Sequence, residues 1–216
     1  MPRRLLLPLI ALALLASCGT DTSGDANVTI APTTLANGDI KISSTPTDQW
    51  GPTSTCPIPA GNNVQGTAAT EGIEGVQAFP TQSQDHKDGC LTYANYPPIG
   101  GAHNQAWATC GFYSSPVPLV NAVHSMEHGG VWVTFSPDIS QAELKVIIAA
   151  TGSSPFVLAS PYPNLGAPIV LSAWTRQLRL DSTSDPRFAK FISTYVQGPQ
   201  TPELGPPCKQ GFGTPG

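Results

Sequence analysis

The pattern of apolar and polar positions divides the chain into four parts. An apolar run extends from Leu5 to Ala16, and a polar stretch without hydrophobic periodicity follows it up to about residue 55. Short apolar segments then alternate with turn residues as far as Cys208. We therefore expect a leader at residues 1–17, a flexible tether at residues 18–55, a folded domain at residues 56–208 and a disordered tail at residues 209–216.

Short segments rich in β-branched and aromatic residues predict the strands of the domain. The clearest is Gly130–Phe135, which ends at Ser136-Pro137, because Pro cannot donate a hydrogen bond to a neighbouring strand. Weaker strand patterns, also bounded by turn residues, occupy Gly75–Pro80, Leu91–Tyr93, Phe156–Ala159 and Ile169–Trp174, and the last could continue to Leu180.

Capping residues predict two helices. Ser140 with Glu143 forms a capping box that starts a helix running to about residue 150. Asp185-Pro186 predicts the start of a second helix. The apolar face of this second helix consists of Phe188, Phe191, Ile192 and Tyr195. Strands with two separate helices predict an α+β fold, a mostly antiparallel sheet with two helices in a single compact domain.

The amino-terminal segment has the parts of a secretory signal. Arg3 and Arg4 precede the apolar run, which is shorter than the about 20 residues that a transmembrane helix needs. Leu15-Ala16-Ser17-Cys18 resembles the lipobox of bacterial lipoproteins. This resemblance implies cleavage before Cys18, a lipid such as palmitate on that cysteine, and an extracytoplasmic domain anchored to the cell membrane. An ordinary signal with a chance cysteine is the alternative.

Composition and charge narrow the classes of function. The formal net charge is −4 and charged residues make up 11% of the chain, against about 25% in a typical soluble domain. Acidic and basic residues are not clustered, so we expect no nucleic acid as a partner. The chain also lacks a G-x-S-x-G nucleophile motif and a phosphate-binding glycine loop. These absences favour a binding protein over an enzyme.

Four cysteines follow Cys18, and an even number in an exported chain favours disulfides. Their spacing excludes a C-x-x-C zinc or redox motif. Three pairings are possible, of which we prefer Cys56–Cys90 with Cys110–Cys208.

The four histidines of the chain are candidates for one metal site. His124 and His128 share a face in a helix, and in a strand they would share a side with Met126. His86 and His103 precede them in polar or turn-rich segments. Imidazoles suit copper, zinc, iron and nickel, and a thioether favours Cu(I). We therefore predict a copper ion held by these histidines, with Met126 as an additional candidate ligand and zinc as the alternative ion.

A series of motifs in fixed order extends over about residues 72–208. Its main parts are His86, Tyr93–His103, Cys110–Tyr113, Val123–Val133, Ser160–Pro163, Pro168–Trp174, Asp185–Arg187 and Pro202–Gly205 with Cys208. The series resembles an uncharacterised bacterial family, domain of unknown function 3105. The resemblance implies that all four histidine positions belong to the family pattern, whereas the Met126 position is commonly leucine. It supplies no activity.

A zinc hydrolase is one competing interpretation. His124-Ser125-Met126-Glu127-His128 fits the H-x-x-E-H order of inverted zinc peptidases, in which Glu127 would be the general base. Glu203 would be the third ligand, but it lies in a Pro-rich segment where we do not expect a fixed side chain. Five-residue matches also arise often by chance.

A binding module without metal is the other interpretation. Its histidines would be structural, hydrogen-bonded residues. Its aromatic residues would form a core or a binding groove: Tyr93, Tyr96, Trp107, Phe112, Tyr113, Trp132 and Trp174.

Overall fold

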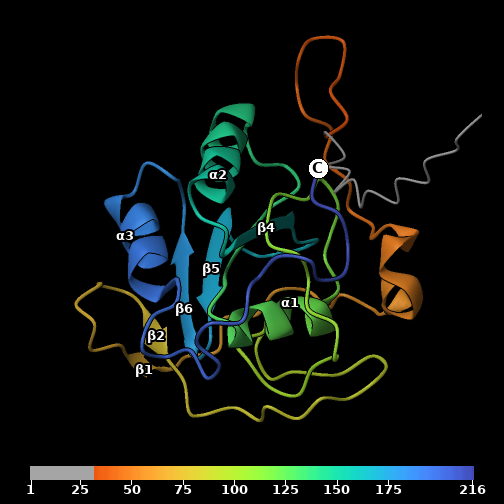
Figure 1. Cartoon of the computed structure of the whole chain (residues 1–216). Helices are drawn as coiled ribbons and strands as arrows, with labels where there is room; N and C mark the ends of the chain where they lie inside the picture. Colours follow the sequence, from red (N-terminus) through yellow and green to blue (C-terminus); the bar gives the residue numbers. More distant parts are fainter. Residues whose placement is uncertain (1–31) are drawn as a thin grey trace, which may run out of the picture.

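A computed structural model describes residues 32–216, so the expected leader and Cys18 lie outside the described residues. Within this range no helix is long and apolar enough to cross a bilayer. The elements, in chain order, are η1 (Asp48–Thr55), β1 (Thr67–Ala68), β2 (Gln77–Ala78), α1 (Leu119–Glu127), β3 (Val131–Phe135), α2 (Gln141–Ser153), β4 (Val157–Pro161), β5 (Ile169–Ala173), β6 (Arg176–Leu180) and α3 (Pro186–Tyr195) (Figure 1).

The described strands form one mixed sheet with the order β1-β2-β6-β5-β3-β4. All neighbours pair antiparallel except β3 and β4, which pair in parallel. The parallel pair follows from the connection between them, because α2 carries the chain back to the starting edge of the sheet. The prediction of an α+β domain with a mostly antiparallel sheet is confirmed.

The prediction of two helices is wrong, because the described chain contains four. The capping box starts α2 as expected, with the Ser140 hydroxyl accepting from the Glu143 amide, and Asp185 caps α3 in the same way. The unpredicted helix α1 begins after Pro118 without a side-chain cap, and all of its residues are buried. Its polar face is buried along with its apolar face, so it lacks the charged stripe that marks a surface helix in the sequence. The predicted strand at Leu91–Tyr93 is absent.

The core lies on both faces of the sheet. One cluster contains Val133, Leu171 and the apolar faces of α2 and α3. The opposite cluster contains Trp132, Val170 and the apolar face of α1. Neighbouring strand residues thus belong to different clusters, as the two-residue period of a strand requires. Figure 1 shows α2 and α3 beside each other and apart from α1.

The folded unit extends beyond the expected limits of residues 56–208. Within the expected tether, Trp50 of η1 is buried and its ring packs against Tyr113 and Phe212, with centroids 5.3 and 6.4 Å away. Within the expected tail, the Phe212 amide donates to the Trp107 carbonyl at 2.7 Å. Burial of the large Trp50 ring holds the expected tether and the expected tail against the folded domain. The polar composition around Trp50 did not indicate that this one residue is buried.

The described part of the chain contains two disulfides, Cys56–Cys90 and Cys110–Cys208. These are the pairs preferred in the sequence analysis. The second one attaches the carboxy-terminal segment next to α1, where the Cys110 amide also donates to the Cys208 carbonyl at 2.6 Å.

Candidate metal centre

Helix α1 supplies two candidate ligands, His124 and Glu127, which lie one turn apart on the same face. Its opposite face packs Ala122, Val123 and Met126 into the core. The helix ends at Glu127, and beyond it the Gly129 amide donates to the Met126 carbonyl and the Gly130 amide to the Ser125 carbonyl. This pattern is a Schellman motif, and the positive φ of 86° at Gly129 suits glycine.

Two loops bring His86 and His103 to this face of α1. The loops pair through their backbones, because the Lys87 amide donates to the His103 carbonyl at 2.7 Å and the His103 amide to the Asp85 carbonyl at 3.0 Å. Gly101 precedes His103 with φ of 117°, a backbone conformation that a residue with a Cβ rarely adopts. The turn therefore aims His103 at the helix.

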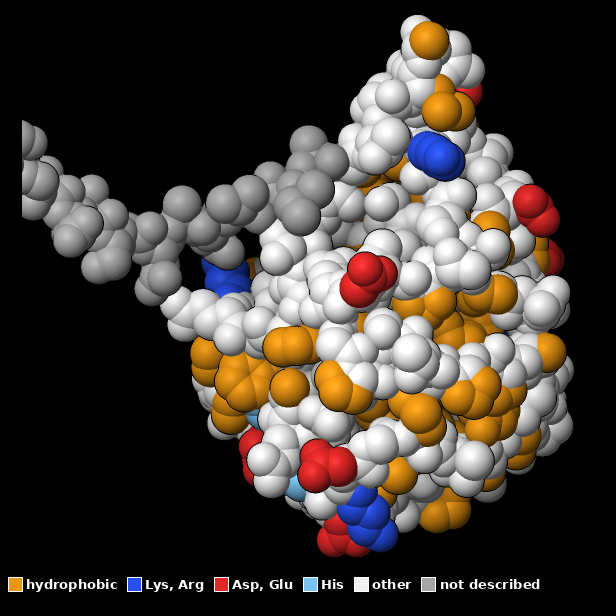
Figure 2. Space-filling view, turned by 90° about the vertical axis from the view of Figure 1, so that its right-hand side faces the viewer, with side chains coloured by type: hydrophobic (Ala, Val, Ile, Leu, Met, Phe, Trp, Pro, Cys, Tyr) orange, Lys and Arg blue, Asp and Glu red, His pale blue; other side chains and the backbone are white. Residues whose placement is uncertain are grey.

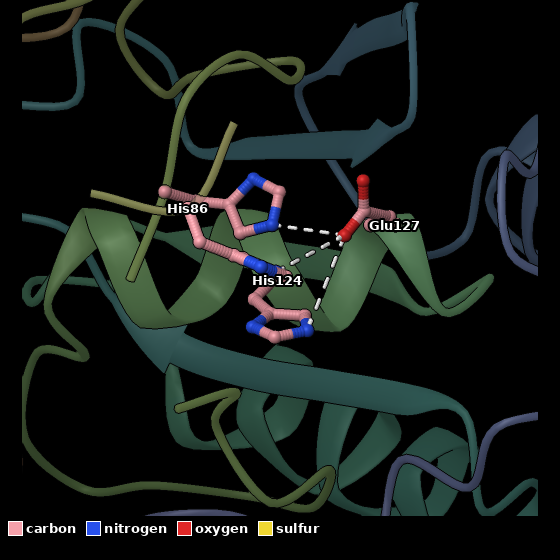
Figure 3. A group of neighbouring side chains, drawn as sticks. His86, His124 and Glu127 are labelled. Carbon is pink, nitrogen blue, oxygen red and sulfur yellow. Dashed lines mark ion pairs between the residues drawn. The ribbon is translucent and has the colours of Figure 1, made fainter. Parts of the chain in front are cut away.

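The side chains converge on one carboxylate oxygen, Glu127 Oε2. His103 Nε2 lies 2.9 Å from it, His86 Nε2 3.9 Å and His124 Nε2 4.0 Å. Figure 3 shows His86 and His124 beside the Glu127 carboxylate. The ligand atoms of these four residues lie within 4.8 Å of one another. Two donors that each lie about 2.0–2.1 Å from one ion are roughly 2.8 to 4.2 Å apart. The three measured separations fall within that range.

Backbone carbonyls orient two of the imidazoles. His103 Nδ1 lies 2.8 Å from the Gly101 carbonyl oxygen, and His124 Nδ1 lies 2.7 Å from that of Asn104. Donation from Nδ1 leaves Nε2 of each ring as the nitrogen that carries a lone pair. Histidines that bind metals are held by second-nitrogen contacts of this kind.

The Glu127 carboxylate is the unusual group in this arrangement. Its side chain is 1% exposed, and neither oxygen accepts a hydrogen bond in the structure. His103 Nε2 is also buried without a hydrogen-bond partner, although it lies 2.9 Å from Glu127 Oε2. Two acceptors facing each other at that distance repel unless a proton or a metal ion shares the space. Burial of a carboxylate without a compensating charge costs roughly several kcal/mol of desolvation free energy. The residues therefore fit a cation.

Burial also controls the protonation of the helix histidines. It lowers the pKa of His124 to about 4, against the opposing hydrogen bond to Asn104. Burial likewise lowers the pKa of His128, against the attraction of Glu203. Both rings are thus neutral near pH 7, which is the form that binds a metal.

The remaining predicted ligands lie in different places. His128 Nε2 is 3.0 Å from His124 Nε2, next to the four-residue group but outside it. Met126 is fully buried in the apolar cluster on the opposite face of α1, so its proposal as a ligand is wrong. That proposal depended on a strand, whereas a helix turns residue 126 away from residues 124 and 128.

The structure also corrects the roles expected for the two glutamates. Glu127 was expected as the general base of a hydrolase, and it lies among the candidate ligands. Glu127 lies three residues after His124, so the two side chains share a face if the segment is a helix. A helix prediction would therefore have identified Glu127 as a candidate ligand. Glu203, expected in an unfixed segment, lies 3.7 Å from His128 Nε2 and donates its amide to the Glu127 carbonyl at 3.1 Å.

The aromatic residues line no shared groove. Phe112, Tyr113, Trp132 and Trp174 are buried in the core, and Tyr93 and Tyr96 pack against it. The half-buried Trp107 covers the histidines instead, with ring centroids 5.6 Å from His124 and 5.0 Å from His128. On the face drawn in Figure 2, small areas of histidine are visible close to acidic side chains.

Comparison with known proteins identifies a family whose function is unknown. Residues 85–210 match the sequence profile described as "Protein of unknown function (DUF3105)", which is more than half of the chain. The chain therefore belongs to this family. No curated protein and no solved structure matches it.

Proposed function

We propose that this member of the family binds a divalent transition-metal ion through His86, His103, His124 and Glu127. The observation that supports this function best is the Glu127 carboxylate, which is buried without hydrogen bonds and has an imidazole acceptor 2.9 Å away. A divalent cation satisfies both acceptors at once. In a purely structural cluster, a proton between His103 Nε2 and Glu127 Oε2 would satisfy the two atoms instead.

The donor set favours copper or zinc. Three imidazoles and one carboxylate suit Zn²⁺, and such sites bind Cu²⁺ more tightly than the other divalent ions of the first transition row. Without Met126 the argument for Cu(I) no longer applies. We therefore propose Cu²⁺ as the preferred ion and Zn²⁺ as the alternative.

The expected lipid anchor gives this binding a place in the cell. If Cys18 carries the lipid, the tether holds the domain at the membrane surface outside the cytoplasm, where it meets metal ions directly. The function is then metal binding or handling at that surface. Metabolic labelling with a radioactive fatty acid tests the anchor, because Cys18→Ser should abolish incorporation.

Calorimetric titration of the metal-free full chain with Cu²⁺ and with Zn²⁺ tests the metal site. We expect one ion per chain, and loss of this binding in both His103→Ala and His124→Ala. Circular dichroism checks that both variants are folded. Unchanged binding in the two folded variants would contradict the proposed function.

A zinc hydrolase is the second candidate, because Glu203 lies within 3.7 Å of His128 as the third ligand of such a site would. In that arrangement Glu127 would activate water and would not bind the ion. Hydrolysis of a peptide library by the zinc-loaded chain, lost in Glu127→Gln with zinc retained, would support the hydrolase and contradict our ligand assignment.

A further inference from the structure

A line of donor atoms connects the buried metal centre with the protein surface. It begins at Glu203 Oε2, 3.7 Å from His128 Nε2, which in turn lies 3.0 Å from His124 Nε2. His124 Nε2 is 4.0 Å from Glu127 Oε2. Each separation falls in the range of roughly 2.8 to 4.2 Å for two donors of one ion. An ion moving along this line can therefore be held by two donors at each step.

Exposure changes along the line in the same order. The side chain of Glu203 is 49% exposed, that of His128 5% and that of Glu127 1%. Trp107 covers His128 and His124 from the side, and its indole Nε1 donates to the Lys209 carbonyl at 3.3 Å. Because the indole covers the two histidines, Glu203 is the end of this line that faces solvent.

The backbone around Glu203 is fixed to the end of α1. The Glu203 amide donates to the Glu127 carbonyl, and the Gly205 amide donates to the side chain of Gln197 at 3.3 Å. The backbone amide of Gln197 in turn donates to the Gly129 carbonyl at 2.9 Å. Glu203 therefore keeps its position beside His128 by bonds that do not involve its own carboxylate.

Charge distinguishes this approach from the one past His86. His86 is 41% exposed and thus also reaches solvent, but its neighbours Asp85 and Lys87 carry opposite charges 3.8 Å apart. Among residues 32–216, Glu203 forms no ion pair with a Lys or an Arg. An uncompensated carboxylate concentrates cations near it and raises their rate of association.

We propose that His128 and Glu203 form an outer cation-binding position, from which a divalent transition-metal ion passes to His124 and the buried centre. This inference rests on the proposed function. With two protein donors and water as the other ligands, the outer position binds the ion weakly. Its role is to control how fast the centre gains and loses metal, while the inner ligands determine the affinity.

Stopped-flow loading of the metal-free full chain with Co²⁺, followed by its visible absorption, tests this proposal. In Glu203→Gln we expect the association and dissociation rate constants to fall together by about 10-fold, because loading and release both lose the outer position and association also loses electrostatic focusing. The equilibrium affinity and the ratio of one ion per chain should stay within about 2-fold. His128→Gln should slow loading in the same way. Near 1 M salt the charge effect of Glu203→Gln should shrink, because the screening length falls to about 3 Å.

Asp138→Asn is the matched control, because Asp138 is exposed in the turn after β3 and the substitution removes the same unit of charge. Its loading rate should equal that of the native chain. Native rates in Glu203→Gln would overturn the proposal and show that ions pass His86 instead. Faster dissociation with weaker affinity would also overturn it, because Glu203 would then be a ligand of the inner ion. A native chain that binds no Co²⁺ would contradict the proposed function itself.

Discussion

The core of the sheet and the histidine centre are equally buried, but they treat polar groups differently. In the sheet, Trp132 Nε1 donates to Ser160 Oγ at 3.0 Å and Thr134 Oγ1 donates to the Val170 carbonyl at 2.9 Å. In the centre, His103, Glu127 and His128 retain buried atoms without partners. Among the described residues these account for four of the nine such atoms. The polar side chains named in the sheet are thus satisfied within the chain, whereas the centre leaves facing acceptors that a cation could satisfy.

Glu127→Gln should break this contrast with the largest effect. We expect metal affinity to fall by more than the roughly 10- to 100-fold that loss of a ligand-orienting residue costs, because a charged ligand is lost. The metal-free protein should unfold with an unchanged free energy or one raised by about 1–3 kcal/mol, because the amide can donate to His103 Nε2 and the buried charge is gone. Calorimetric titration and urea unfolding measure the two effects.

Glu71→Gln is the matched control for that substitution. Glu71 Oε1 accepts from Arg176 at 2.7 and 2.9 Å, so the charge of this carboxylate is paired within the chain although its Oε2 has no partner. Its loss should destabilise the fold and leave metal affinity unchanged. A destabilised metal-free Glu127→Gln protein would show that Glu127 is an ordinary structural carboxylate.

Leu171→Ala should show the reverse behaviour. Leu171 is fully buried in the cluster that contains α2 and α3, on the face of the sheet away from α1. We expect a loss of about 2–5 kcal/mol in unfolding free energy with metal affinity retained. If this variant does not fold, Ile169→Val provides a milder change of about 0.5–1.5 kcal/mol in the same cluster. A large loss of metal affinity in a folded variant would contradict the separation of the two regions.

Met126→Leu should have the smallest effect, because the side chain lies in the apolar cluster and leucine has a similar volume. We expect a change below about 1.5 kcal/mol in stability and none in metal affinity. The same titration and unfolding measurements apply. A drop in affinity for Cu(I) would place the sulfur among the ligands and restore the thioether site predicted from the sequence.

Local signals predicted the elements with caps or with alternating patterns. The capping box of α2, the Asp185-Pro186 start of α3 and the β-branched run of β3 each depend on neighbours in the sequence. Helix α1 has neither a cap nor an exposed face, and its identity depends on the loop and strand residues that surround it. The helical geometry of residues 119–127 was therefore not predictable from this sequence.

The four histidines were predicted as one cluster, and three of them join Glu127 in one group that could hold a metal ion. The role of Glu127 was missed because it depends on α1 being a helix. His86 reaches the centre through backbone pairing with His103, a contact between two irregular segments that no periodic pattern reveals. Trp50 likewise contacts residues far away in the sequence, so the composition of its neighbours did not indicate burial.

The packing of α1 also bears on which ions the centre accepts. Ala122, Val123 and Met126 hold the helix against the core, so His124 and Glu127 cannot move apart without opening that packing. Calcium needs six to eight oxygen ligands at about 2.3–2.6 Å, which a fixed group of three imidazoles and one carboxylate does not provide. If an ion binds on the polar side of the helix, the packing of its apolar side therefore limits how far the ligands can rearrange around that ion.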